Sequence, residues 1–255
     1  MKLRRTAVAL GLMLAASARA EERGAGPLLG VAASLRSAMP VLIERFVAAE
    51  PGPPLAATYG GSGALQKQVE AGAPIDAVVL AGPGPVDALI AAGHARAETR
   101  RVVGFNRLAL VVPTGGARVG FATLAELPED ESIAIGEPAT VPVGTYAREA
   151  LRALGLWERL APRLVTAPDV AAVLAYARRG EVAAAIVYRS DVLGIEDVEV
   201  RELAEGDWAP RPQIVAALTT HAPAPARAER VLGFLTGPAA AGVLRAHGFE
   251  PGSAP

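Results

Sequence analysis

Short apolar runs alternate with segments of helical periodicity along most of this chain. Apolar residues spaced as on one face of a helix occupy residues 34–49, between two strand-like runs. Runs of strand length lie at residues 28–32, 55–59, 77–80, 108–112, 132–135, 183–188 and 214–219. Such alternation predicts an α/β fold in which helices cover parallel sheets.

The first twenty residues have the pattern of a secretory signal peptide. Basic residues within the first five positions precede an apolar run over residues 7–16, and Ala18-Arg19-Ala20 supplies a small-residue cleavage site. The apolar run is shorter than the ~20 residues that cross a bilayer. We therefore expect export to the periplasm, cleavage after Ala20 and a soluble mature chain.

Chain length predicts two lobes. About 235 residues remain after the signal peptide (residues 1–20), which exceeds the ~150 residues of a typical domain. Because the sequence has no linker rich in Ser and Gly, we expect strand-like crossovers at Gly104–Arg107 and Arg211–Val215. The predicted lobes are residues 21–105 with 216–255, and residues 106–215.

Composition excludes several classes of function. The chain has no cysteine, which rules out disulfides, thiol nucleophiles, cysteine metal sites and a lipidated N-terminal cysteine. Removing the signal peptide removes four basic residues and no acidic one, so the net charge falls from -1 to -5. A nucleic-acid partner is not expected of such a chain. Any anionic ligand must be held by local dipoles and hydrogen bonds.

Several predicted helices begin directly after a strand, with groups suited to an anion. Ser34 and Ser62 stand at N-cap positions, and Ser62 is flanked by glycines that permit close approach of a ligand. Two more helices are expected to start near Val143 and after Asp169, while Tyr188 ends a strand. Helix N-termini offer unpaired amides and a positive dipole end.

Each of these features alone has an ordinary structural explanation. Capping accounts for Ser34 and Ser62 without any ligand, and a tyrosine at a strand end commonly packs in the core. Their common location favours a ligand site, because open α/β sheets bind ligands at the carboxyl edge of their strands. The residues thus predict a small oxyanion site without identifying the central atom.

Five strings distributed in order over the mature chain resemble the periplasmic molybdate-binding proteins of ABC transporters. They are Val31-Ala32-Ala33-Ser34-Leu35, residues 68–76 (QVEAGAPID), residues 136–147 (GEPATVPVGTYA), residues 185–191 (AIVYRSD) and residues 237–249, from Gly-Pro-Ala to His-Gly-Phe. The resemblance implies a two-lobed type II periplasmic binding protein fold with molybdate or tungstate between the lobes.

The resemblance also implies a ligand set and a partner. The contacts would be the hydroxyl and amide of Ser34 and Ser62, the backbone amides of Val143 and Val170, and the Tyr188 hydroxyl. Molybdenum would then be bound as an oxyanion, with no metal coordinated directly by side chains and no cofactor. The expected partner is an ABC transporter membrane permease, and the expected state is a monomer.

The chain departs from the family pattern at a few positions. Val143 stands where alanine is common, and Ala81-Gly82-Pro83 replaces Ser-Ala-Asp after the third strand. Pro40 falls inside the predicted first helix, where it would cost an amide hydrogen bond. A helix that starts at Ser37 would accommodate Pro40 in its first turn, and it would weaken the case for Ser34 as an N-cap.

Competing functions have less support in the sequence. The three histidines are far apart and no nucleophile or metalloprotease motif is present, so an enzyme is not expected. Other ligands stay open, namely sulfate, phosphate, a ferric ion with an anion, or a small carboxylate. A ferric site needs further ligands beside Tyr188, and a carboxylate site would use Arg189, which strand alternation points away from Tyr188.

Overall fold

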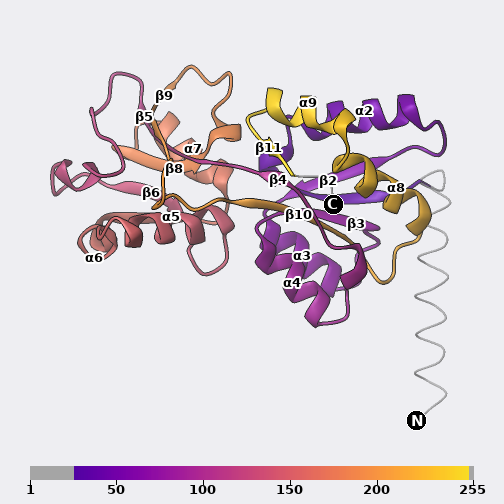
Figure 1. Cartoon of the computed structure of the whole chain (residues 1–255). Helices are drawn as coiled ribbons and strands as arrows, with labels where there is room; N and C mark the ends of the chain where they lie inside the picture. Colours follow the sequence, from indigo (N-terminus) through magenta and orange to yellow (C-terminus); the bar gives the residue numbers. More distant parts are fainter. Residues whose placement is uncertain (1–25, 253–255) are drawn as a thin grey trace, which may run out of the picture.

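The chain forms two α/β lobes that lie side by side in the computed structural model, which describes residues 26–252 (Figure 1). The predicted signal peptide and its cleavage site lie outside these residues. One sheet has six strands in the order β11-β4-β10-β3-β1-β2, and the other has five in the order β7-β6-β8-β5-β9. We call the six-stranded sheet with its helices the first lobe and the five-stranded sheet with its helices the second lobe.

The sheet of the first lobe is mixed, where the sequence predicted parallel strands. Strand β1 lies between β2 and β3 and is parallel to both, but β10 is antiparallel to β3 and β4. The reversal has a topological cause, because β10 enters from the second lobe and runs away from it. The strands are β1 (Leu28–Ala32), β2 (Ala56–Gly60), β3 (Ala77–Ala81), β4 (Arg101–Phe105), β10 (Gln213–Leu218) and β11 (Glu250–Pro251).

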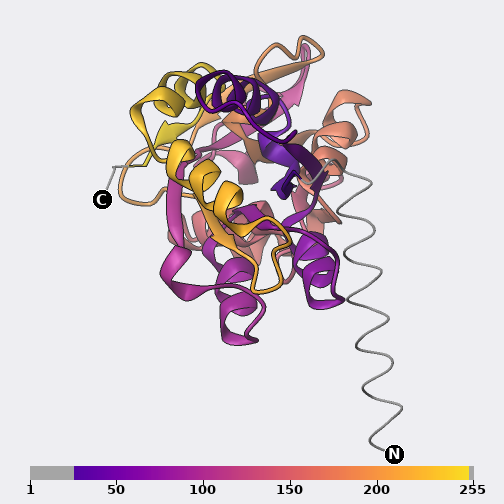
Figure 2. The same cartoon turned by 90° about the vertical axis from the view of Figure 1, so that its right-hand side faces the viewer.

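Helices cover both faces of the first sheet. Alternate residues of β3 point to opposite faces, so Val78 and Leu80 pack with the core beside α3 and α4 while Val79 belongs to the other core. Figure 2 shows α2 and α9 at one side of this lobe and α3 and α4 at the other. The helices are α2 (Met39–Ala49), α3 (Ser62–Glu70), α4 (Pro83–Ala91), α8 (Pro225–Leu235) and α9 (Pro238–Ala246).

The second lobe repeats this arrangement on a smaller scale. Strand β6 is parallel to β7 and β8, whereas β5, which enters from the first lobe, is antiparallel to β8 and β9. Helices α5 and α7 cover opposite faces of the sheet (Figure 1). The elements are β5 (Leu108–Pro113), β6 (Ile133–Gly136), α5 (Pro142–Ala153), α6 (Trp157–Leu160), β7 (Leu164–Ala167), α7 (Val170–Arg178), β8 (Ala184–Tyr188) and β9 (Val198–Leu203).

The first predicted helix begins later than its apolar spacing suggested. A short 3-10 helix, η1 (Ala33–Leu35), follows β1, and the α-helix α2 starts only at Met39. Pro40 explains the later start of α2, because proline has no backbone N–H to donate and is tolerated only in the first turn of a helix. Ser34 is therefore not the N-cap of an α-helix, and this part of the prediction was wrong. Another short 3-10 helix, η5 (Arg189–Asp191), follows β8.

The chain crosses between the lobes twice, at residues 106–107 and 204–212. The crossovers touch, since the Asn106 amide donates to the Pro212 carbonyl at 2.7 Å. The predicted boundary at residue 216 falls inside β10, which belongs to the first sheet. That boundary was placed too late, because an apolar strand start resembles an extended crossover. We propose residues 106–212 as the second lobe.

No helix in residues 26–252 is both long and apolar enough to cross a membrane.

Candidate functional site

All five residues that the sequence analysis proposed as ligand contacts line one small cavity between the lobes. Ser34 and Ser62 come from the first lobe, and Val143, Val170 and Tyr188 come from the second. These residues are between 1% and 7% exposed, so little of any of them faces bulk solvent. Its volume is about 30 Å³, which is on the order of two water-sized spaces. We call it the inner cavity.

Two hydroxyl groups in the inner cavity have no hydrogen-bond partner. In residues 26–252 the buried hydroxyls in this condition are those of Ser34 and Tyr188, which come from opposite lobes. Leaving a buried polar group unpaired costs about 1–3 kcal/mol, so native proteins rarely tolerate it without a reason. A ligand that accepts hydrogen bonds from both lobes would supply the missing partner.

Ser62 has a role that the sequence did not reveal. It is the first residue of α3 and not its N-cap, which is Gly61. Its Oγ accepts a hydrogen bond from the Ala81 amide, at the end of β3, with an N···O distance of 3.0 Å. A hydroxyl that accepts in this way keeps its own proton available for the cavity. The N-cap assignment was wrong because the partner of Ser62 Oγ is not an amide of α3 but the Ala81 amide of strand β3.

Backbone amides at two helix starts complete the set of donors. Val143 is the second residue of α5 and Val170 is the first residue of α7, so geometry gives neither amide an intrahelical acceptor. The helix predicted to start after Asp169 is confirmed as α7, and Asp169 is its N-cap, with Oδ1 accepting from the Ala172 amide at 2.8 Å. Both helices thus direct the positive ends of their dipoles toward the inner cavity.

The donors in the cavity are neutral. Asp169 is the one charged residue among the described residues that line the inner cavity, and it is occupied as a cap. Burial raises the pKa of the Tyr188 phenol well above its ordinary value, as do the nearby Tyr146 and Asp191. The phenol therefore keeps its proton at neutral pH. In residues 26–252 no group of three His, Cys, Asp or Glu side chains could hold a metal ion.

Asp191 lies in η5, three residues after the cavity residue Tyr188, and no role was predicted for it from the sequence. Its Oδ2 accepts from the Tyr188 amide at 3.1 Å, which fixes the turn after β8. Burial raises the pKa of the Asp191 carboxyl to about 7, and the bond from the Tyr188 amide opposes this increase. A carboxylate three residues after the end of a strand was the available signal, because Asp commonly bonds to nearby backbone amides in turns.

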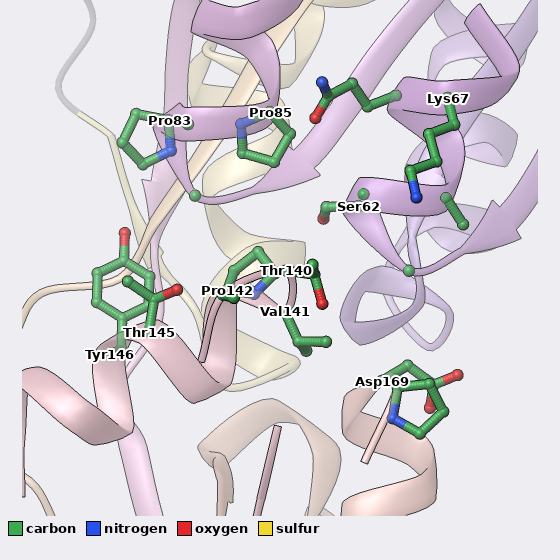
Figure 3. A pocket seen from close by; sticks show the side chains of 18 of the residues that line it. Ser62, Lys67, Pro83, Pro85, Thr140, Val141, Pro142, Thr145, Tyr146 and Asp169 are labelled. Atoms are coloured by element: carbon green, nitrogen blue, oxygen red, sulfur yellow. The ribbon is translucent and has the colours of Figure 1, made fainter. Parts of the chain in front are cut away.

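A larger pocket of about 740 Å³, which we call the outer cleft, adjoins the inner cavity between the lobes. Gly61, Ser62, Val141, Pro142 and Asp169 line both spaces. In Figure 3 residues of the first lobe face residues of the second lobe across this cleft. The labelled residues are Ser62, Lys67, Pro83 and Pro85 on one side and Thr140, Val141, Pro142, Thr145, Tyr146 and Asp169 on the other.

Arg189, the candidate residue for a carboxylate ligand, lies outside this arrangement. It belongs to η5, and it is not among the described residues that line the inner cavity or the outer cleft. The inner cavity therefore offers hydroxyl and amide protons without a guanidinium group. Such a site suits a compact anion with several acceptor atoms.

Fold and site together define a two-lobed binding protein that encloses a small ligand between its lobes. A family model described as bacterial extracellular solute-binding protein matches residues 28–250. The chain belongs to this family. It is similar to the molybdate-binding protein ModA of Escherichia coli (strain K12), with 32% identity over 224 residues, which are 86% of this chain and 86% of that protein.

Solved structures confirm the type II periplasmic binding protein fold. The periplasmic molybdate-binding protein of Azotobacter vinelandii superposes with a TM-score of 0.78 at 20% identity, over 89% of this chain and 100% of that chain. The sulfate-binding protein SubI of Mycobacterium tuberculosis H37Rv gives the same TM-score of 0.78 at 14% identity, over 89% and 86%. At such identities the likeness concerns the fold alone, so the ligand must be argued from the site.

Proposed function

We propose that this protein captures molybdate, and also tungstate, outside the cytoplasm and delivers it to the membrane permease of an ABC transporter. The observation that carries the proposal is the pair of buried, unpartnered hydroxyls, Ser34 Oγ and Tyr188 OH, which line one cavity from opposite lobes. A tetrahedral oxyanion has four acceptor oxygens, enough to engage both hydroxyls together with the Ser62 hydroxyl and the helix amides.

Neutral donors suffice for this ligand. A dianion that leaves water needs its lost hydrogen bonds replaced, and preorganised hydroxyls and amides replace them. An arginine or lysine would add stronger charge-assisted bonds and would slow release to the permease. The absence of a cation from the described lining of the inner cavity therefore favours a carrier that must both bind and release.

The identity of the central atom rests on similarity. The relative from Escherichia coli is named as a molybdate-binding protein at 32% identity, and all five ligand positions expected from the family pattern line the inner cavity. We propose that the protein acts as a monomer, without a cofactor and without catalysis. Its proposed address is the periplasm, after cleavage of the signal peptide behind Ala20.

Isothermal titration tests the proposal. The mature protein is titrated at neutral pH with molybdate, tungstate, sulfate and phosphate in turn. We expect tight binding of the first two and no measurable binding of the others. Tight binding of sulfate or phosphate instead would keep the receptor and overturn the assigned ligand. A lack of measurable binding for all four anions would overturn the oxyanion function.

A further inference from the structure

The glycines on both sides of Ser62 lie against the opposite lobe. A Cβ atom built on Gly63 would lie 3.1 Å from the carbonyl oxygen of Thr140, and one built on Gly61 would lie 3.7 Å from Cβ of Asp169. Thr140 and Asp169 both belong to the second lobe. The start of α3 is thus a place where the two lobes approach closely, and at Gly63 the nearest atom of the second lobe is a backbone carbonyl oxygen.

The backbone conformation does not require glycine at residue 63. It is the second residue of α3, and its φ does not lie in the left-handed region. Alanine would even favour the helix. The sequence analysis attributed the glycines around Ser62 to close approach of a ligand. Gly61 lines the inner cavity, whereas Gly63 lines only the outer cleft, and the nearest atom to a Cβ at residue 63 is the Thr140 carbonyl oxygen of the second lobe.

Thr140 is connected directly to the anion site. It precedes Val141, the N-cap of α5, and Val143 two residues further offers its amide to the inner cavity. Any atom that pushes the Thr140 carbonyl away from α3 moves the start of α5 with it. Hydrogen bonds weaken steeply outside their normal distance and angle range, so a small displacement removes the Val143 donor from the ligand.

We propose that Gly63 determines lobe closure: its missing side chain lets the Thr140 carbonyl dock on the first turn of α3, which completes the donor set around the anion. The inference rests on the proposed function, because closure is read through anion affinity. The lobes are in contact in this structure, where η1 of the first lobe touches α7 and η5 of the second. Closure of two lobes around a ligand is a common binding motion.

A graded series of side chains at residue 63 tests the inference by titration with molybdate. We expect Gly63→Ala to weaken binding a few-fold, since its contact at 3.1 Å needs only a small shift. Gly63→Leu should weaken binding more than tenfold. The controls are Gly242→Ala and Gly242→Leu, at an exposed position of α9 where an added Cβ meets nothing within 4 Å. Wild-type affinity in Gly63→Leu would overturn the inference.

A distance measurement separates closure from anion chemistry. The chain has no cysteine, so Ala71→Cys after α3 and Ala153→Cys at the end of α5 give one spin label on each lobe. With excess molybdate, the wild-type background should show a short interlobe distance that Gly63→Leu lacks. Equal distances in both backgrounds would overturn the proposal.

The same labels keep the inference testable if the proposed function fails. Should the wild-type protein bind none of the four anions, the oxyanion function falls, and the ligand-free distance distributions are compared. A short-distance population that Gly63→Leu loses would support the closure role of Gly63. Identical distance distributions in the wild type and Gly63→Leu would contradict the closure role of Gly63. Urea unfolding of Gly63→Ala should show an unfolding free energy at least equal to that of the wild type, which excludes a folding defect as the cause of weaker binding.

Discussion

Replacing Tyr188 by phenylalanine should change stability and affinity in opposite directions. The side chain is 2% exposed, and its hydroxyl has no hydrogen-bond partner. In the ligand-free protein, this substitution removes a buried unpaired group that destabilises the folded state by about 1–3 kcal/mol. The free energy of unfolding without ligand should therefore rise, by at most this amount. The rise is smaller if the lobes open and water reaches the hydroxyl.

The same change removes a donor to a charged ligand. Such hydrogen bonds contribute about 1.5–3 kcal/mol, which corresponds to a loss of about 10- to 150-fold in affinity at 1.4 kcal/mol per decade. Urea unfolding and molybdate titration measure the two effects on one preparation. Tyr176→Phe on α7, outside the described lining of both spaces, is the matched control and should change neither quantity. Lower stability with unchanged affinity would refute the assignment of Tyr188 to the site.

Three further substitutions test separate parts of the structure. Ser62→Ala should weaken molybdate binding by about 1–3 kcal/mol, and a titration without loss would make Ser62 purely structural. Gly144→Ala should lower the unfolding free energy by about 1–3 kcal/mol or more, because its Cβ would lie 2.0 Å from the Gly136 carbonyl oxygen. Urea unfolding measures this effect, and Gly233→Ala, which has open space around its Cβ, is the control. Asp191 has its pKa raised from 3.8 to about 7, so the wild type loses stability as pH rises through this window. Asp191→Asn should therefore gain stability relative to the wild type as the pH rises from about 4 to about 7, and a constant difference in unfolding free energy over this range would contradict the pKa assignment.

Most inner strands of both sheets were predictable because they are short, continuous apolar runs. Strands β1, β3, β5, β6, β8 and β10 all coincide with such runs to within one or two residues. Strands β7, β9 and β11 were missed because they lie at sheet edges, where one side faces solvent and polar residues interrupt the run. The inner strand β4 was missed as well, since it starts at Arg101 and its last residues, Gly104 and Phe105, were assigned to a crossover. In β9, for example, Glu199 and Arg201 alternate with valines, and Val200 is 45% exposed. Strand direction could not be predicted, since it depends on where the chain crosses between lobes.

The positions of the site were easier to predict than the roles of its residues. The pattern of a helix starting after a strand located Ser62 and Asp169 at the cleft, and both do start helices there. Asp169 caps its helix through a local contact, because its partner amide lies three residues away. For Ser62 the local pattern was misleading, because its hydroxyl pairs with Ala81, nineteen residues distant. A contact between a helix and a strand far apart in the sequence leaves no signal in local spacing.

The distribution of donors between the lobes explains how one site can both bind and discriminate. The open protein offers an anion either the serine hydroxyls of the first lobe or the amides and Tyr188 hydroxyl of the second, and neither set replaces a full hydration shell. Only closure brings Ser34 and Tyr188 onto the same ligand. An anion too large for the inner cavity would hold the lobes apart, and one too small would leave a buried hydroxyl unpaired. Selectivity is then a property of the closed state, and a residue such as Gly63 that sets how closely the lobes approach acts on selectivity without touching the ligand.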